Sequence, residues 1–226
     1  MLEPRPDFVY EGTHVKPQRS HKYLGIYFDQ ELRWDVQAEN AIAKAAKWTL
    51  LFRRLTKPST GIHTTFMCCL YRAIAVPKYT YAADVWFTPL HRKEGQKRTT
   101  GSVNVVRKLT SIQRIATTAI TGAMRTTATD TLEAHADIQP IELTLLETCH
   151  RAVLRLASLP KSHPLHKPIS TCARRMVKRH ASPLHNLLHT FGIKLDAYET
   201  IVPALLPPNK TNTFMTEIAE QGTSLK

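Results

Sequence analysis

The chain has 226 residues, of which 42% are hydrophobic, and this is enough for one sizeable core or two small ones rather than a disordered polymer. Lys and Arg number 31 against 18 Asp and Glu, which gives a formal net charge of +13 and predicts an anionic partner. No stretch approaches the roughly 18 consecutive apolar residues of a membrane span, and the N-terminus lacks a secretory apolar core, so we expect an intracellular chain, in cytoplasm or nucleus, with reduced cysteines and no membrane partner.

The N-terminal region favours strands. Tyr23 to Phe28 is a compact aromatic and β-branched run and is the best strand prediction in the sequence. Phe8 to Tyr10 and His14 to Val15 could supply partner strands, with Gly12 in the turn between them. Because a lone hairpin is marginally stable in water, this element should need something to pair with or pack on.

Helical spacing begins after this region. Val36 to Thr56 places apolar residues at intervals of three and four along one face, and lysine and arginine on the opposite face. Ser59 or Thr60 could cap a second helix that ends near Pro77. Pro77 in turn suits the first turn of a third, short segment up to Phe87.

The rest of the chain alternates loops and helices. Thr88 to Ser102 is a basic loop longer than the usual connection, which predicts a functional loop or an insertion. Further helices are predicted at Val103 to Thr121 with Gly122 as C-cap, from Thr129 or Asp130 towards His135, and from about Ile141 to Leu159. Beyond Pro160, prolines interrupt the sequence and only about Cys172 to Phe191 has helical spacing.

Together these elements predict a mainly α fold. A small β-hairpin or edge strands at the N-terminus should precede a bundle of about five or six helices and a weakly ordered, Pro-rich C-terminal tail. The predicted division is a hairpin region at residues 1–35, a helical domain at 36–159, and a linker-like tail with one helix at 160–226.

Four segments carry a resemblance to a known family. They are Lys22 to Asp29 with Leu32 and Trp34; Tyr81-Ala82-Ala83-Asp84-Val85-Trp86; Ile112-Gln113-Arg114 followed by Ile120-Thr121-Gly122-Ala123 and Arg125-Thr126-Thr127; and Ile138-Gln139-Pro140. In this order they resemble the region after the catalytic palm in reverse transcriptases of LINE-type, non-LTR retrotransposons, over about residues 20 to 160. The resemblance implies a palm edge followed by the helical thumb and connection of an RNA-directed DNA polymerase.

The sequence departs from the family pattern at two glycines. Ala82 stands where the family's Tyr-Gly-x-x-x-Trp segment has glycine, and His135-Ala136-Asp137 stands where a glycine often precedes the isoleucine. Both changes are consistent with a divergent or decaying copy.

Catalytic groups are not predicted. The family's polymerase chemistry needs clustered carboxylates for two metal ions, normally including an adjacent Asp-Asp pair, and this sequence has no such pair. Residues 170–226 offer too few acids for the ribonuclease H domain that many relatives carry. His185 and His189 have helical i, i+4 spacing, but candidates such as Cys172 and His180 lack the spacing of a zinc site. We therefore expect a chain that is not an enzyme on its own and that uses no cofactor or metal.

The expected activity is binding to nucleic acid. By resemblance the region holds the template and primer duplex, RNA or DNA, through its phosphates, and the missing palm or ribonuclease H parts of a full-length element are possible partners. The cationic helix faces agree with this, since lysine and arginine suit backbone phosphates. The predicted contacts are Lys44, Lys47, Arg53, Arg54, Lys57, Arg107, Lys108, Arg114 and Arg125. Two alternatives remain open: a basic helical module that docks on acidic proteins, and a decayed fragment without function.

Overall fold

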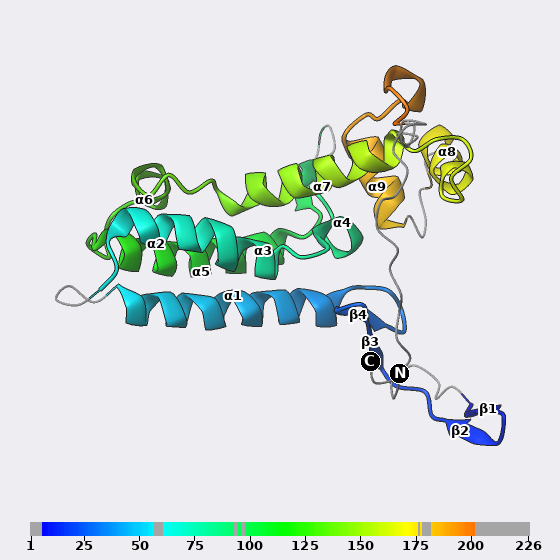
Figure 1. Ribbon diagram of the computed structural model, residues 1–226, viewed down its shortest axis with the longest axis horizontal. Helices are drawn as coiled ribbons and strands as arrows, with labels where there is room; N and C mark the ends of the chain where they lie inside the picture. Colours follow the sequence, from blue (N-terminus) through cyan, green and yellow to red (C-terminus); the bar gives the residue numbers. More distant parts are fainter. Residues whose placement is uncertain are drawn as a thin grey trace, which may run out of the picture.

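The computed structural model describes residues 6–56, 61–92, 95, 98–175, 177 and 182–201. Helices dominate it, and short antiparallel hairpins accompany them, so the predicted mainly α class is confirmed (Figure 1). The strands are β1 (Phe8–Tyr10), β2 (Thr13–Val15), β3 (Ser20–Tyr23), β4 (Ile26–Asp29), β5 (His91–Arg92) and β6 (Thr99–Thr100). They pair in sequence order, β1 with β2, β3 with β4 and β5 with β6.

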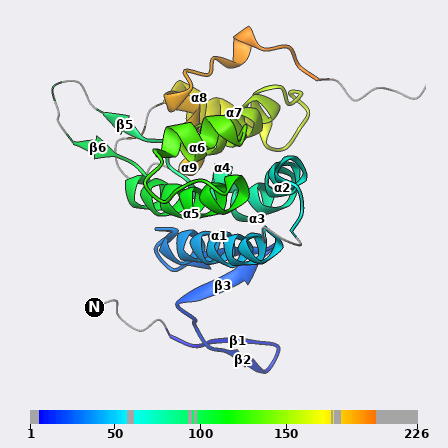
Figure 2. The same ribbon diagram turned by 90° about the vertical axis from the view of Figure 1, so that its left-hand side faces the viewer.

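The helices form a layered body. Their bounds are α1 (Asp35–Leu55), α2 (Thr64–Leu70), the π-helical η1 (Tyr71–Ala75), α3 (Val76–Tyr79), α4 (Ala83–Trp86), α5 (Val103–Thr121), α6 (Thr129–His135), α7 (Ile141–Ala157), α8 (His166–Arg174), α9 (Pro183–Thr190) and the 3₁₀ turn η2 (Leu195–Ala197). Figure 2 shows α1 as an outer layer, α5 with α2 and α3 in the middle, and α6 and α7 above them. The long helices α1 and α5 pack side by side and begin at the same end of the body.

One continuous core joins these layers. Ala41, Ala45 and Phe52 point from α1 into the body, where the ring of Phe52 meets that of Tyr71 edge to face at 5.6 Å between centroids. The predicted helix over Val103 to Thr121 is confirmed at both ends, and Gly122 follows it at φ +66°, a left-handed conformation that glycine adopts without strain.

The predicted strand from Tyr23 to Phe28 is wrong. A two-residue turn at Leu24 and Gly25, with φ of +47° and +85°, splits this run into the facing strands β3 and β4. Positive φ at both central positions gives a turn whose twist suits a tight hairpin. The turn that contains Gly12 joins two strands as expected, because Phe8–Tyr10 pairs with Thr13–Val15. These two strands do not pair with the Tyr23 to Phe28 run.

Asp29 connects β4 to the first turn of α1. Its carboxylate accepts hydrogen bonds from the backbone N–H groups of Glu31 at 3.1 Å, Arg33 at 2.9 Å and Trp34 at 2.7 Å. Burial alone would raise the pKa of Asp29, but these three donors outweigh it and lower the pKa below the ordinary value. The second anchor is Gln37 on α1, whose Oε1 accepts the backbone N–H of Tyr27 at 3.0 Å. The hairpin β3–β4 is thereby fixed to the helical body.

A buried tyrosine pair supports the turn from η1 into α3. The hydroxyls of Tyr71 and Tyr79 lie 3.2 Å apart. Burial raises the pKa of Tyr71 to about 12 and that of Tyr79 well above its ordinary range, because the ionised phenolate is poorly solvated there.

We expect single Tyr71→Phe or Tyr79→Phe substitutions to lower the free energy of unfolding by about 1–2 kcal/mol, since each leaves one buried hydroxyl without a partner. The double substitution should cost less than the sum. Because both folded-state pKa values are raised, this contribution is present below pH ~10 and is lost as the pH rises towards 12. Urea unfolding at pH 8 and near pH 11 measures both effects, and equal pH sensitivity of wild type and double variant would contradict the assignment.

The region after Pro160 contributes to the core. The sequence predicted one helix over Cys172 to Phe191, and this is wrong in detail, because α8 ends at Arg174 and α9 begins at Pro183, with Ser182 accepting the backbone N–H of His185 as N-cap. Ile169, Leu187, Leu188 and Ile193 are buried in the same core as α1, α5 and α7. The three-part domain division stays a prediction, and residues 202–226 lie outside the described part.

Candidate nucleic-acid interface

The cations of α1 lie on its outer side. Lys47, Arg53 and Arg54 are exposed, whereas Lys44 is half-buried. The helix buries Ala41, Ala45 and Phe52 against the body, and its outer side carries these cations together with the exposed Leu50, Leu51 and Leu55. Lys57, a fifth predicted contact in this stretch, lies outside the described residues.

The cations of α5 and the following loop have two kinds of surroundings. Arg107 and Lys108 are exposed in the first turns of α5, and Arg125 is exposed after its end. Arg114 is half-buried and engaged within the chain, where its guanidinium donates to the Thr129 hydroxyl at 2.8 Å and to the Arg125 carbonyl at 2.8 Å. Arg114 therefore braces the loop between α5 and α6, and a further phosphate contact by it stays a prediction.

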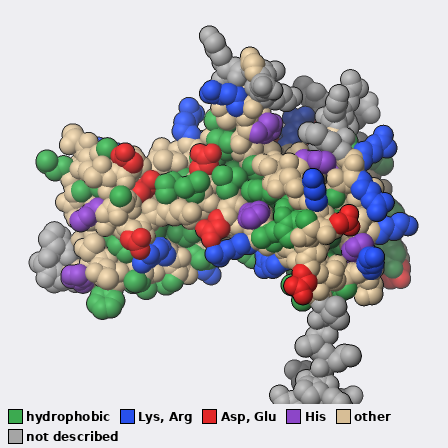
Figure 3. Space-filling model, turned by 90° about the horizontal axis from the view of Figure 1, so that it is seen from above, with side chains coloured by type: hydrophobic (Ala, Val, Ile, Leu, Met, Phe, Trp, Pro, Cys, Tyr) green, Lys and Arg blue, Asp and Glu red, His purple; other side chains and the backbone are tan. Residues whose placement is uncertain are grey.

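Few cations are neutralised by ion pairs in the part of the chain that the structure describes. Within the described residues, ion pairs join Arg33 to Glu31, Arg72 to Asp137 and Arg151 to Glu147, and none of them includes a predicted nucleic-acid contact. On the face shown in Figure 3, Lys and Arg side chains gather towards the end that carries α8, with acidic side chains between them and along the body. The surface thus keeps excess positive charge that solvent or an anionic ligand must screen.

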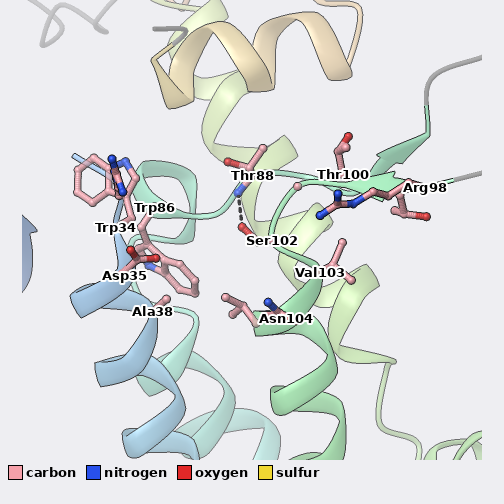
Figure 4. Close-up of a pocket in the computed structure, with 14 residues that line it drawn as sticks. Trp34, Asp35, Ala38, Trp86, Thr88, Arg98, Thr100, Ser102, Val103 and Asn104 are labelled. Atoms are coloured by element: carbon pink, nitrogen blue, oxygen red, sulfur yellow. Dashed lines mark hydrogen bonds between the residues drawn. The ribbon is translucent and has the colours of Figure 1, made fainter. Parts of the chain in front are cut away.

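A cleft of about 740 Å³ opens where α1 and α5 begin (Figure 4). Asp35 and Ala38 line it from α1, together with Trp34 just before that helix, and Val103 and Asn104 line it from α5. The segment around β6 adds Arg98 and the hydroxyl-bearing Thr99, Thr100 and Ser102. The Ser102 hydroxyl accepts the backbone N–H of Thr88 at 3.0 Å, which closes one wall.

The cleft is polar, with mixed charge. Arg98 is exposed and has no ion pair among the described residues, Arg33 is paired with Glu31, and Asp35 adds a carboxylate. Sequence reasoning missed this cleft and singled out only the long basic loop that forms its wall. Gly101, at φ +104°, is required there, because an added Cβ would lie 2.4 Å from the Pro89 carbonyl oxygen.

The segments that carry the family resemblance contact one another in pairs. The Tyr81 hydroxyl donates to the Leu24 carbonyl at 3.1 Å, and its ring packs so closely on Gly25 that a Cβ there would meet it at 3.3 Å. Gln113 Nε2 donates to the Gln139 carbonyl at 3.0 Å and to the Glu133 carboxyl at 2.8 Å. Two pairs of these segments, which are separate in the sequence, are therefore connected by hydrogen bonds in the fold.

Two residues at the departures from the family pattern have left-handed backbone. Ala82 has φ +53° and ψ +33° at the start of α4. Asp137 has φ +51° between α6 and Ile138. Glycine adopts this conformation without strain. In alanine the Cβ causes steric strain there, and aspartate tolerates the conformation better than alanine does.

The histidines considered for zinc bind other groups. His185 Nδ1 lies 2.8 Å from the Ser182 hydroxyl, and His189 Nε2 lies 3.1 Å from the Cys172 carbonyl. Within the described part of the chain, no group of three or more His, Cys, Asp or Glu residues is placed to hold a metal ion. None of the helices described is long and apolar enough to cross a bilayer.

No protein-family model, no curated protein and no solved structure matches this chain.

Proposed function

We propose that the chain is a piece of a LINE-type reverse transcriptase, from the palm edge through the thumb and connection, and that its own activity is sequence-independent binding to the nucleic-acid backbone. The palm and ribonuclease H parts would belong to the full-length element. The exposed cations Lys47, Arg53, Arg54, Arg107 and Lys108 would contact phosphates, and the helical body would hold them in fixed positions.

The observation that carries the family proposal is the backbone at Ala82 and Asp137. The family pattern has glycine at the position of Ala82 and often has glycine before the isoleucine, where Asp137 stands in this chain, and both residues have positive φ. A copy that diverged by substituting these glycines would keep the backbone conformation and accept some strain. The paired contacts of Tyr81 with Leu24 and of Gln113 with Gln139 support the same proposal, because they join segments chosen only for their resemblance.

The strain at Ala82 gives a stability prediction. Ala82→Gly is expected to raise the free energy of unfolding by about 0.5–1 kcal/mol, because relief of the left-handed alanine outweighs the added freedom of the unfolded chain. The matched control is Ala43→Gly, at an exposed position inside α1, which should lower it by about 0.5–1 kcal/mol. Urea titration gives the free energy of unfolding of the wild type and the two variants. A destabilised Ala82→Gly variant would show that the backbone at Ala82 is not strained.

Salt dependence tests the binding activity. Filter binding of the full chain to an RNA–DNA duplex and to a DNA duplex of unrelated sequence should give similar affinities at low salt. Both should fall steeply between about 50 and 200 mM salt, because bound cations release condensed counterions. No binding at low salt, or binding that does not change with salt, would contradict the proposal. Displacement of the duplex by an acidic protein present at a much lower concentration than the duplex would favour the protein-docking alternative.

The family assignment has a separate test in the genome. The in-frame sequence upstream of Met1 should encode a palm with an aromatic residue followed by an Asp-Asp pair. A promoter directly upstream, with no palm-coding remnant in any frame, would count against it.

A further inference from the structure

The hairpin β1–β2 stands apart from the helical body in both Figure 1 and Figure 2. Phe8 and Tyr10 are two residues apart on β1, so their side chains lie on the same face of the hairpin. Their cross-strand partners on β2 are Val15 and Thr13. The exposed fractions of Phe8 and Tyr10 are 63% and 61%. Two large rings are therefore held on a hydrogen-bonded ladder without the cover that such side chains usually have.

The two rings have the geometry of a stacking platform. Their centroids are 6.5 Å apart and their planes differ by 17°. Bases along one strand of a duplex are about 3.4 Å apart and already stacked on one another, so a duplex cannot place a separate base on each ring. An unpaired strand can splay its bases and stack them on successive aromatic side chains, and it does so without regard to sequence because every base has a π face.

The charges around the rings favour one side for a nucleic-acid backbone. Asp7 and Glu11 stand at the two ends of β1, where they repel phosphates. Lys16 and Arg19 follow β2, are exposed, and take part in no ion pair among the described residues. A strand whose bases meet Phe8 and Tyr10 would thus run its phosphates along the β2 side.

We infer that the β1–β2 hairpin binds single-stranded nucleic acid, with Phe8 and Tyr10 stacking on two unpaired bases and Lys16 and Arg19 contacting the adjacent phosphates. This inference rests on the proposed function, which concerns the duplex and the helical body, and it assigns the unpaired strand to a different element.

Fluorescence anisotropy of the full chain with labelled dT12 and with a 12-base-pair DNA duplex tests it. Phe8→Leu combined with Tyr10→Leu keeps apolar side chains but removes the π faces, and should weaken dT12 binding by about tenfold to a hundredfold while duplex binding changes less than about twofold. The matched control is Phe66→Leu, since Phe66 on α2 is also exposed, at 66%, and this change should leave both affinities unaltered. Phe8→Trp combined with Tyr10→Trp should retain or tighten dT12 binding, which separates stacking from loss of folding.

The other outcomes are distinct. Duplex binding without any dT12 binding by the wild type overturns the hairpin inference and leaves the proposed function standing, whereas binding to neither overturns both. Equal loss of both ligands in the leucine variant, or no loss at all, also overturns the inference. A wild type that self-associates in size-exclusion chromatography, and a leucine variant that does not, would assign this face to a second copy of the chain instead.

Discussion

Simultaneous replacement of Lys47, Arg54, Arg107 and Lys108 by glutamine is expected to lower the affinity of the chain for duplex nucleic acid by roughly 10²–10³ at 0.1 M salt. All four side chains are exposed, and none takes part in an ion pair among the described residues. Each lost phosphate contact removes about one released counterion, so the slope of log affinity against log salt should become shallower by about 3–4. Glutamine has similar helix propensity, and the fold should survive.

The control removes arginines that are already neutralised. Arg72 and Arg151 pair with Asp137 and Glu147, so Arg72→Gln with Arg151→Gln should change affinity and salt slope far less per residue. Anisotropy titrations at four salt concentrations give both quantities. If the paired and unpaired sets weaken binding equally per charge removed, only net charge matters and no defined face exists on the helical body.

Gln113→Leu is expected to destabilise the fold by about 2–4 kcal/mol. Gln113 is 1% exposed and supplies the donor for two acceptors, the Glu133 carboxyl and the Gln139 carbonyl. Leucine fills a similar volume but donates no hydrogen bond, so the carboxyl of Glu133, a residue that is 7% exposed, would lose the donor Gln113. The joint between α5, α6 and α7 should therefore weaken.

A second substitution distinguishes this cause from poor packing. Gln113→Leu combined with Glu133→Leu removes both the donor and the main acceptor, and should recover a substantial part of the lost stability. Ser111→Ala, at an exposed position on the same helix, should cost less than about 0.5 kcal/mol. Thermal or urea unfolding of the four proteins completes the comparison, and a double variant that is no more stable than Gln113→Leu alone would assign the loss to shape rather than to hydrogen bonding.

Elements whose ends are set by local chemistry were predictable from the sequence. The helix α5 has an apolar stripe along its whole length, and Gly122 directly after it can adopt the left-handed conformation. Both ends of α5 could therefore be predicted from the sequence. The run from Tyr23 to Phe28 was wrongly predicted as one strand because its composition favours a strand throughout. In the structure the chain turns at Leu24, which has positive φ. Gly25 was the available signal. Ser182 and Pro183 were likewise signals for the start of α9 that helical spacing alone concealed.

The candidate interface was predictable only in part. Helical periodicity depends on neighbours three and four residues away, and it placed most of the predicted cations of α1 and α5 on exposed positions, although Lys44 is half-buried. It could not reveal that Arg114 is engaged by Thr129 and Arg125, because those partners come from the next element. The cleft beside Arg98 was hidden for the same reason, as its walls come from segments far apart in sequence. The conformations of Ala82 and Asp137 likewise needed coordinates.

The side-by-side packing of α1 on α5 also sets an order of events during synthesis. The helix α1 leaves the ribosome first, but its main partner follows only after α2, η1, α3 and α4 have been made. Until then Phe52 and its neighbours have no finished core to enter, and loop closure over that length delays docking. A nascent chain halted before Val103 lacks α5, so the core-facing side of α1 stays exposed to chaperones or to self-association.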